Sequence, residues 1–437
     1  MDLKKVKSIY FLGIGGIGMS ALAKYFLFKG VNVCGYDRVE TELTKNLSVS
    51  GADIHYEDDV SLIPFVDQID LVVYTPAIPT SNMELIYFKK NNYVLRKRAN
   101  VLGNITKDYN TIAVAGTHGK TTTSSIIAHI VSCAEKGGVA FLGGVTTNYN
   151  SNILLSKGDI AVVEADEYDR SFLELSPNTI VLTSLDPDHL DIYEKPDQVI
   201  KSFLEFTSLL NNGKKPIVCE EIESHFIEKL TYGFNTSSNL QLVNISIVDH
   251  TYNFDLMYNG ELYSNFIFQL PGRYNLLNAA GAVLACIVNG LSMQDIKNGL
   301  ATFLGVKRRF EVHIETPSLT FIDDYAHHPK EIEVLINAIV EFYPSRKITA
   351  IFQPHLYSRT RDFMIEFSKS FSRLDRLFLL PIYAAREKPI SGVSSKDLYD
   401  LININNKILV KKNQPFYNNL IIENDQVIVT IGAGDID

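Results

Sequence analysis

The segment AGTHGKTT at residues 115–122 carries the residue types of a phosphate-binding loop. Its end, GKT, matches the GK[ST] end of such loops, in which the lysine reaches the outer phosphates of a nucleotide and the hydroxyl binds Mg²⁺. The general pattern has a further glycine five positions before Gly119, where this chain has Val114. We therefore predict a nucleotide-binding loop that is shorter than usual. The candidate ATP-binding residues here are Gly116, Thr117, His118, Gly119, Lys120, Thr121 and Thr122.

A phosphate loop of this kind needs an acidic metal partner on a neighbouring strand. Glu164 follows the apolar run 160–163 and supplies a carboxylate at the end of an expected strand. Because Mg²⁺ prefers hard oxygen ligands, we assign Glu164 and Thr121 to one metal ion. His189 lies in the segment DPDHLDIY after the next expected strand. Its position at the carboxyl end of a strand, where ligands gather in α/β proteins, makes His189 a candidate site residue, with a structural role as the alternative.

The segment GIGGIG at residues 13–18 is a GxGxxG motif between an expected strand and an expected helix. Glycines let backbone amides approach a pyrophosphate, and the helix N-terminus adds partial positive charge. Asp37 ends the next expected strand, where an acidic residue can bind a ribose. From these residues alone the ligand is either a nicotinamide dinucleotide or a diphosphate nucleotide such as a UDP-sugar. The candidate binding residues are Gly13, Gly15, Gly16, Gly18 and Asp37.

Candidate polar residues also occur in the later part of the chain, on one expected helix and after two expected strands. Asn275 and Asn278 are three positions apart and therefore share one face of an expected helix. A helix cap explains Asn275, whereas Asn278 lies inside the helix and suggests a hydrogen-bonding task. The segments DDYAHHP at 323–329 and QPHLYSRT at 353–360 each follow a strand. At the second segment, either Arg359 or the nearby Arg361 can pair bidentately with a carboxylate or a phosphate.

These segments must be positioned by alternating strands and helices. Apolar runs at 8–12, 31–36, 71–74, 111–115, 160–163, 179–182, 319–322, 348–352 and 376–380 predict strands, and 19–28 predicts a helix. Such alternation is typical of doubly wound, mostly parallel sheets. Residues 240–270 alternate with period two around Asn259-Gly260, which predicts a hairpin at the edge of the central sheet or covering it. We place domain boundaries after residues 106 and 311, giving domains 1–106, 107–311 and 312–437.

Composition agrees with this organisation and limits the partners. The 437 residues suggest about three domains at roughly 150 residues each. Lys and Arg total 41 against 50 Asp and Glu, a net charge of −9, which argues against binding nucleic acid or anionic lipid. The four cysteines form no CxxC pair, and the glycines at 13–18 interrupt what would otherwise resemble a signal peptide. No apolar run reaches the roughly 18 residues of a membrane span, so we expect a soluble, cytoplasmic protein.

Eight ordered blocks resemble the Mur ligase family along the whole chain. They are GxGGxGMSALA at 13–23, GTHGKTTT at 116–123, EADEYDRSFL at 164–173, DPDHLDIY at 186–193, RYNLLNAA at 273–280, RRFE at 308–311, DDYAHHP at 323–329 and QPHLYSRT at 353–360. The resemblance implies a Rossmann-like N-terminal domain for the UDP moiety, a central ATPase domain, and a Rossmann-like C-terminal domain that closes on the site. It favours a UDP-sugar over a nicotinamide at the first glycine loop.

The resemblance also implies roles for particular residues. Lys120, Glu164 and His189 would be catalytic, with Thr121 and Glu164 on one Mg²⁺ and His189 at a second metal site. Asn275 and Asn278 would lie near the adenine of ATP. Arg308 would lie near the phosphates of ATP. The residues implied to enter on domain closure are Asp324 for ATP, and His327, His328 and Arg359 for the UDP-sugar. Tyr168 departs from the serine that many members have in the EADES block, which leaves the neighbourhood of the substrate's lactyl group open.

The activity that the resemblance implies most closely is ATP-dependent ligation of L-alanine to the lactyl carboxylate of UDP-N-acetylmuramate, with Mg²⁺, through an acyl phosphate. We expect a monomer or a weak homodimer that does not insert in membranes. One alternative is recycling of a preformed murein tripeptide by the same chemistry. A nicotinamide-dependent dehydrogenase would leave the phosphate loop and Glu164 unexplained. A non-enzymatic nucleotide switch is a third possibility, which ATP hydrolysis insensitive to amino acids would support.

Overall fold

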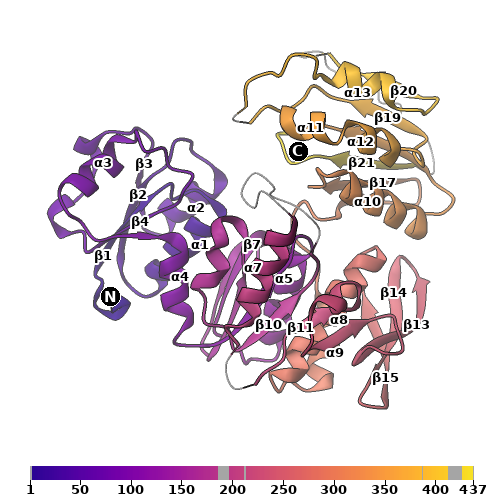
Figure 1. The fold of residues 1–437 in the computed structure, drawn as a ribbon, viewed down its shortest axis with the longest axis horizontal. Coiled ribbons are helices and arrows are strands. Elements are labelled where there is room, and N and C mark those ends of the chain that lie inside the picture. Colours follow the sequence, from indigo (N-terminus) through magenta and orange to yellow (C-terminus); the bar gives the residue numbers. More distant parts are fainter. Residues whose placement is uncertain (1, 186–195, 211–212, 386, 412–425, 437) are drawn as a thin grey trace. The chain divides into compact units, whose positions relative to one another are not determined.

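The structure is a computed structural model and describes residues 2–185, 196–210, 213–385, 387–411 and 426–436. The described strands form three sheets of five, ten and six strands (Figure 1). The residues cluster into two compact units. The first contains Met1–Val243, Asp255–Phe266 and Leu277–Phe303, and the second contains Asn244–Phe254, Ile267–Leu276 and Leu304–Asp437.

The five-stranded sheet has the order β3-β2-β1-β4-β5, and all of its neighbouring strands are parallel. Its strands are β1 (Ser8–Leu12), β2 (Asn32–Tyr36), β3 (Asp53–His55), β4 (Leu71–Tyr74) and β5 (Leu95–Lys97). The helices between them are α1 (Ile17–Phe28), α2 (Glu42–Val49), α3 (Met83–Lys90) and α4 (Arg98–Thr106), with short 3-10 turns η1 (Leu3–Lys5), η2 (Val60–Leu62) and η3 (Val66–Gln68).

Every residue of β1 is buried because β1 is a central strand with packed layers on both faces. On one face Tyr10 packs against Phe88 of α3, with ring centroids 5.0 Å apart. Just after β1 the chain turns at Gly13, whose φ of +83° favours glycine. This tight turn directs the chain straight into α1 and leaves the glycine loop at the carboxyl end of the sheet.

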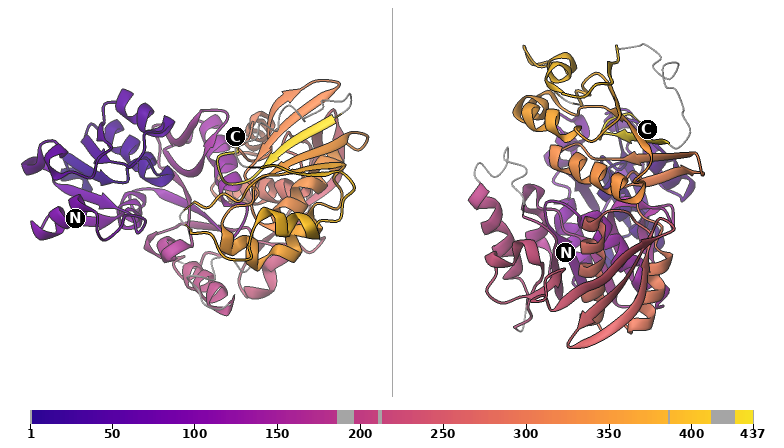
Figure 2. Two further views of the ribbon diagram at one scale, coloured as in Figure 1. Left: turned by 90° about the horizontal axis from the view of Figure 1, so that it is seen from above. Right: turned by 90° about the vertical axis from the view of Figure 1, so that its right-hand side faces the viewer.

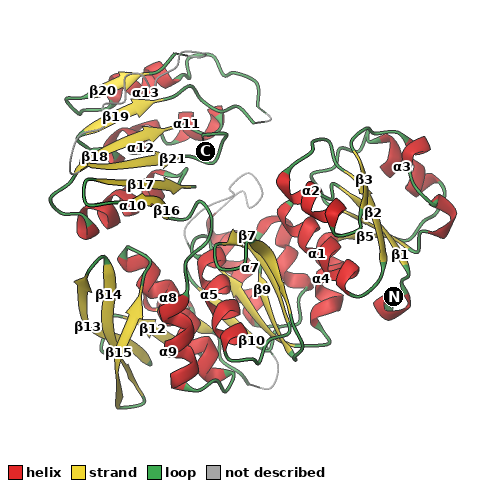
Figure 3. Cartoon of the chain, turned by 180° about the vertical axis from the view of Figure 1, so that it is seen from behind, coloured by secondary structure: helices red, strands yellow, loops and turns green. Residues whose placement is uncertain are grey.

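The ten-stranded sheet has the order β15-β14-β13-β12-β11-β10-β6-β9-β7-β8 (Figure 3). In this spatial order, each neighbouring pair from β12 to β7 is parallel, and β8 is antiparallel to β7. They are β6 (Asn110–Ala115), β7 (Val139–Thr146), β8 (Ser151–Leu155), β9 (Ile160–Glu164), β10 (Thr179–Leu182), β11 (Ile217–Cys219), β12 (Leu230–Gly233), β13 (Leu240–Val248), β14 (Thr251–Tyr258) and β15 (Glu261–Phe268). The helical elements are α5 (Lys120–Cys133), η4 (Tyr168–Glu174), α7 (Pro196–Thr207), η5 (Glu220–His225), α8 (Arg273–Val288) and α9 (Met293–Thr302).

The six-stranded sheet has the order β16-β17-β21-β18-β19-β20 and is parallel except for the β16–β17 pair. Figure 2 shows this last part of the chain in orange to yellow from two further directions. Its strands are β16 (Glu311–Glu315), β17 (Leu319–Asp324), β18 (Lys347–Phe352), β19 (Arg376–Leu379), β20 (Lys407–Leu409) and β21 (Gln426–Ile431). Its helices are α10 (Pro329–Phe342), α11 (Tyr357–Asp362), α12 (Met364–Ser370) and α13 (Ser395–Leu401).

The predicted strands are all present to within one or two residues, and the hairpin predicted around Asn259-Gly260 extends the edge of the central sheet. The hairpin β7–β8 was not predicted because its sequence lacks a strict two-residue period. The cysteines Cys34, Cys133, Cys219 and Cys286 are free thiols in the described structure. Among the described helices, none has the length and apolar character needed to cross a membrane.

Candidate active site

The phosphate loop joins β6 directly to α5 and consists only of Gly116, Thr117, His118 and Gly119. This confirms the short loop predicted from Val114. The backbone requires both glycines: φ is +140° at Gly116 and +82° at Gly119. A Cβ atom at Gly116 would lie 2.1 Å from the hydroxyl of Thr183, and one at Gly119 would lie 2.4 Å from Oδ1 of Asn278. The loop is therefore packed too closely for any larger residue at either position.

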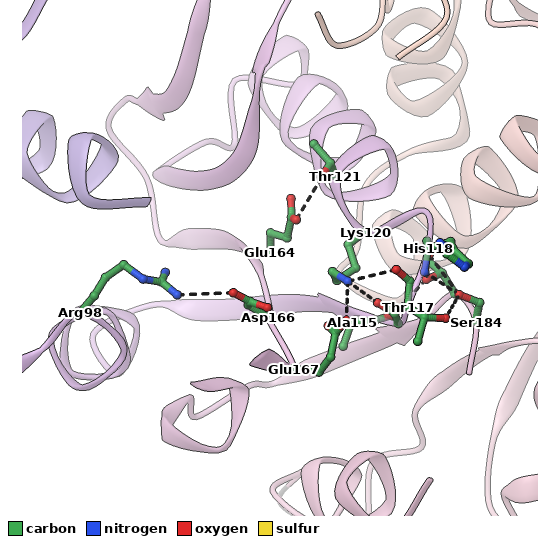
Figure 4. A network of polar contacts seen from close by, with 12 residues as sticks. Arg98, Ala115, Thr117, His118, Lys120, Thr121, Glu164, Asp166, Glu167 and Ser184 are labelled. Carbon is green, nitrogen blue, oxygen red and sulfur yellow. Dashed lines mark hydrogen bonds and ion pairs between the residues drawn. The ribbon is translucent and has the colours of Figure 1, made fainter. Parts of the chain in front are cut away.

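Lys120 begins α5 and folds back over the loop (Figure 4). Its ammonium donates to the carbonyl oxygens of Gly116 at 2.6 Å and Thr117 at 3.3 Å, and to Oε1 of Glu167 at 2.9 Å. Burial alone would lower the pKa of Lys120, but the carboxylates of Glu167 and Glu164 outweigh burial and raise that pKa above its usual value. Lys120 is therefore a fixed positive charge at the mouth of the loop.

Thr121 and Glu164 meet at the same edge of the sheet (Figure 4). The hydroxyl of Thr121 donates to Oε1 of Glu164 at 3.0 Å, and the backbone N–H of Gly143 on β7 donates to Oε2 at 2.8 Å. A Cβ atom at Gly143 would lie 2.4 Å from the carboxylate oxygens, so a glycine is needed there. These hard oxygens, one of which is held by a backbone amide, form a donor set that suits Mg²⁺.

The loop after β10 holds the phosphate loop from the other side. Ser184 accepts the N–H of His118 at 2.8 Å and shares a hydrogen bond with the Thr117 hydroxyl at 2.9 Å. The neighbouring Thr183 hydroxyl donates to the carbonyl oxygens of Ala115 and His118. The sequence offered no motif at these positions, and only their place at the end of the strand beside β6 could have indicated them.

The two asparagines of α8 occupy different positions. Asn278 accepts a hydrogen bond from the Thr123 hydroxyl at 3.3 Å and lies against Gly119, so it packs on the phosphate loop. Asn275 lies in the first turn of α8, where its amide donates to the carbonyl of Pro271 at 2.7 Å. Both side chains are buried. Their predicted closeness to adenine stays a prediction.

The first glycine loop precedes α1, whose N-cap Gly16 provides no side-chain cap. The N–H groups of Gly13 and Ile14 both donate to the carbonyl of Tyr36, at 2.8 and 3.0 Å. Asp37 accepts the N–H of Gly15 at 2.7 Å, so its carboxylate lies on the loop itself. No side chain caps the N-terminus of α1, which begins at Ile17. The backbone N–H groups of this first turn are therefore suited to binding an anion.

Arg98, the first residue of α4, lies in the first compact unit and points toward Asp166 (Figure 4). Its guanidinium lies 3.8 Å from the carboxylate of Asp166, which follows β9. A Cβ atom at Gly18 would lie 3.0 Å from Nη1 of Arg98. Arg98 could not be predicted from the sequence, because a single arginine at the start of a helix carries no spacing signal.

Three predicted residues, Asp324, His327 and His328, lie at or just after the end of β17. Asp324 accepts the N–H groups of Phe310 at 2.7 Å and Ala326 at 2.8 Å, and burial raises its pKa to about 6. The Nδ1 atom of His327 lies 2.9 Å from the carbonyl oxygen of Tyr325. Because a carbonyl oxygen only accepts hydrogen bonds, Nδ1 must carry the proton. Burial lowers the pKa of His327, which favours the neutral ring. His328 caps α10.

Arg308 and its hydrogen-bond partners all belong to the second compact unit. Its Nε donates to Asp323 at 3.1 Å, and its terminal nitrogens donate to the carbonyls of Gly434 at 3.2 Å and Gly432 at 2.7 Å. The structure thus gives this side chain a clear role in fastening the segment after β21. Arg359 of α11 lies 3.4 Å from Nδ1 of His355. His189 is outside the described residues.

The fold has three α/β sheets. In the five-stranded sheet a glycine loop leads into α1, whose N-terminus has no side-chain cap. In the ten-stranded sheet a phosphate loop leads into α5, with Glu164 beside Thr121, and this combination defines a nucleotide-dependent enzyme. Three sequence profiles match nearly the whole chain. They are "Mur ligase family, catalytic domain" at residues 8–110, "Mur ligase middle domain" at 114–286, and "Mur ligase, glutamate ligase domain" at 308–434. The chain belongs to the Mur ligase family.

Curated relatives of full length are similar. The UDP-N-acetylmuramate–L-alanine ligase of Flavobacterium johnsoniae is 45% identical over 439 residues, covering 100% of this chain and 97% of the relative. The protein of the same name from Flavobacterium psychrophilum is 48% identical over 440 residues, with coverage of 100% and 97%.

Solved structures have the same fold. The UDP-N-acetylmuramate–alanine ligase of Thermotoga maritima matches with a TM-score of 0.85 and 28% identity, covering 98% of this chain and 96% of that chain. A murein peptide ligase of Psychrobacter arcticus matches with a TM-score of 0.70, 22% identity and coverage of 98% and 96%. The family resemblance, the three-domain α/β fold and the class of ATP-dependent ligase are therefore confirmed.

Proposed function

We propose that this chain joins L-alanine to the lactyl carboxylate of UDP-N-acetylmuramate, using ATP and Mg²⁺, and produces ADP and phosphate in peptidoglycan precursor synthesis. The observation that carries the proposal is the full-length similarity to relatives of that name at 43–48% identity. The phosphate loop with Lys120 and Glu164 supplies the ATP-dependent chemistry that such a reaction requires.

The reaction needs activation because a carboxylate oxygen is a poor leaving group and an ammonium is not a nucleophile. In the proposed mechanism the lactyl carboxylate attacks the γ-phosphate of ATP, which gives an acyl phosphate and ADP. The neutral amine of alanine then attacks the acyl carbon, and phosphate leaves while the amine gives up a proton. Phosphoryl transfer of this type is catalysed mainly by positioning and by neutralising charge.

The residues of this chain match those tasks. We assign the loop amides at 116–119 and the Lys120 ammonium to the β- and γ-phosphates of ATP. Thr121 and Glu164 would hold Mg²⁺, which, when bound, withdraws charge from the phosphate oxygens. His189 would serve a second metal site. The first turn of α1, with the glycines at 13–18 and Asp37, is assigned to the UDP-sugar, and Arg98 offers a cation between the two loops.

The C-terminal domain would complete the site on closure and exclude water, because an acyl phosphate hydrolyses readily. We assign Asp324 to ATP, and His327, His328 and Arg359 to the UDP-sugar, together with Asn275 and Asn278 near the adenine. We also assign Arg308 to the phosphates of ATP, as the family resemblance implies. The proposed domains are residues 1–106, 107–311 and 312–437. ATP and UDP-sugars are intracellular metabolites, so we propose a cytoplasmic location. We also propose that the chain is a monomer or a weak homodimer.

The test is phosphate release with ATP, Mg²⁺ and UDP-N-acetylmuramate, comparing L-alanine, glycine, L-serine and the murein tripeptide. We expect turnover with L-alanine and formation of UDP-N-acetylmuramoyl-L-alanine by mass spectrometry. Turnover with the tripeptide alone would show the recycling reaction instead. ATP hydrolysis that no amine changes would contradict ligation altogether.

A further inference from the structure

Asn152 connects the two nucleotide-binding halves of the first compact unit. It lies on β8 of the central sheet and is fully buried. Its amide nitrogen donates to the carbonyl of Ile17 at 2.6 Å and to the hydroxyl of Ser20 at 3.0 Å, both on α1 of the N-terminal sheet. Its oxygen lies 3.4 Å from the ammonium of Lys24 on the same helix. One side chain therefore makes three polar contacts with α1.

The contacts fall on the functional end of that helix. Ile17 is the first residue of α1, directly after the N-cap Gly16. The amides of this turn are the ones proposed to hold the diphosphate of the UDP-sugar. The Asn152 amide uses both of its N–H groups, one to Ile17 and one to Ser20. It therefore fixes both the rotation of the first turn of α1 and the distance of that turn from β8. A buried hydrogen-bonded network of this kind is rigid.

At the other end, β8 is tied to the residues proposed to bind ATP and metal. It pairs antiparallel with β7, with Ile153 opposite Phe141, and β7 pairs in parallel with β9. From β7, the N–H of Gly143 donates to the carboxylate of Glu164. Side-chain hydrogen bonds, the β7–β8 pair with its register shift between Phe141 and Thr146, and a short stretch of backbone thus connect the first turn of α1 to Glu164 and Thr121.

We propose that Asn152 is a positioning residue that sets the offset between the UDP-sugar and the γ-phosphate of ATP. The inference rests on the proposed function, because both nucleotides must be bound for the offset to matter. In-line attack requires the carboxylate and phosphorus within about 3–3.5 Å, and a displacement of about 1 Å can cost roughly 100-fold in rate. Loss of the Asn152 amide should therefore lower kcat far more than it weakens the binding of either nucleotide alone.

The test uses the full chain, its Asn152→Ala variant and the matched control Asn148→Ala. Asn148 belongs to the same β7–β8 hairpin, but its amide donates to the carbonyl of Thr302 at 2.8 Å, away from α1. We would measure kcat and KM for each substrate. Calorimetric titration would give the Kd and the number of sites for UDP-N-acetylmuramate alone and for ATP alone.

For Asn152→Ala we expect kcat to fall at least about tenfold, with both Kd values within about threefold of the wild type and one site per chain retained. For Asn148→Ala we expect kcat, the KM values and both Kd values to stay within about twofold of the wild type. A kcat within about twofold of the wild type in Asn152→Ala would overturn the inference. A fall in the number of binding sites that matches the fall in kcat would also overturn it, since that result indicates a merely structural role.

If Asn152→Ala does not fold, Ser20→Ala carries the same test, because it removes one acceptor of the amide and leaves the bond to Ile17. A smaller fall in kcat at unchanged Kd is then expected, and no fall overturns the inference. The wild-type assay separates the two proposals. If the wild-type chain uses the tripeptide and not L-alanine, the proposed function is wrong, and the Asn152 comparison is made with the tripeptide as the amine.

Discussion

Lys120 and Glu167 form a buried ion pair at the phosphate loop, with Nζ 2.9 Å from Oε1. The carboxyl side chain of Glu167 is only 1% exposed, and that of Lys120 is 15% exposed. The same ammonium also holds two loop carbonyls. Lys120 therefore has two tasks: it neutralises a buried carboxylate, and it is the proposed cation for the outer phosphates.

The first prediction follows from these two tasks. Lys120→Ala should abolish turnover and leave the affinity for UDP-N-acetylmuramate nearly unchanged, because the UDP-sugar is assigned to the other loop. It should also destabilise the fold by about 3 kcal/mol, since it leaves a buried carboxylate without its cation. Calorimetric titration and thermal unfolding measure the two effects.

The double variant Lys120→Ala/Glu167→Gln is the control. It removes the stranded charge, so it should recover most of the lost stability and none of the activity. A loss of UDP-sugar affinity as large as the loss of rate would contradict the assignment of Lys120 to ATP.

The second prediction concerns the metal. Thr121→Val keeps the shape of the side chain and removes the hydroxyl that lies 3.0 Å from Glu164. We expect the Mg²⁺ concentration for half-maximal activity to rise at least about tenfold, because one hard oxygen ligand is lost. Thr121→Ser keeps the hydroxyl and should restore the Mg²⁺ dependence. Equal Mg²⁺ curves for the wild type and Thr121→Val would rule out Thr121 as a ligand.

The third prediction separates backbone strain from packing at the phosphate loop. Gly119 and Gly290 have nearly the same φ, +82° and +79°, but a Cβ atom at Gly290 would meet nothing within 4 Å. Gly290→Ala should therefore cost only the left-handed backbone penalty of about 1 kcal/mol. Gly119→Ala adds a contact of 2.4 Å with Asn278 and should lower stability further.

Gly119→Ala should also weaken ATP binding by at least about tenfold, because the loop amides move. Thermal unfolding and titration with ATP measure the two effects. Equal stability of the two alanine variants would show that the loop adapts to the added methyl group.

The fourth prediction concerns Glu84, a fully buried carboxyl in the N-terminal sheet. The hydroxyl of Tyr10 donates to its Oε2 at 2.5 Å, and His55 lies 3.5 Å from its Oε1. Burial raises the pKa of Glu84 to about 7 from the ordinary 4.5. Between these two values the folded chain binds more protons than the unfolded chain. This group therefore costs stability as pH rises from about 4.5 to 7, up to about 3 kcal/mol above pH 7.

Glu84→Gln removes that dependence. The variant should be more stable than the wild type at pH 8 and should lose the advantage by about pH 5. Glu42→Gln, at a side chain that is 86% exposed, should show no such difference. Thermal unfolding between pH 5 and 8 measures this, and a parallel pH dependence of the wild type and Glu84→Gln would contradict the raised pKa.

The sequence alone predicted nine of the described strands, the hairpin around Asn259-Gly260, the two glycine loops and the pairing of a phosphate loop with Glu164. Such features are local: a glycine that needs a positive φ, a lysine beside a helix start and an apolar run before a carboxylate all lie within a few residues. The short loop at Gly116–Gly119 could be predicted for this reason. The family followed because eight local blocks occur in one order.

Tertiary structure alone decided which distant residues meet. Nothing near Asn152 in the chain indicates that it binds the first turn of α1, 135 positions away. In the same way, only the fold brings Glu167 to Lys120, Arg98 beside Gly18, and the donors of Arg308 to Asp323. The physical reason is that such contacts depend on how sheets and helices pack, and packing is a property of the folded chain that no local spacing encodes.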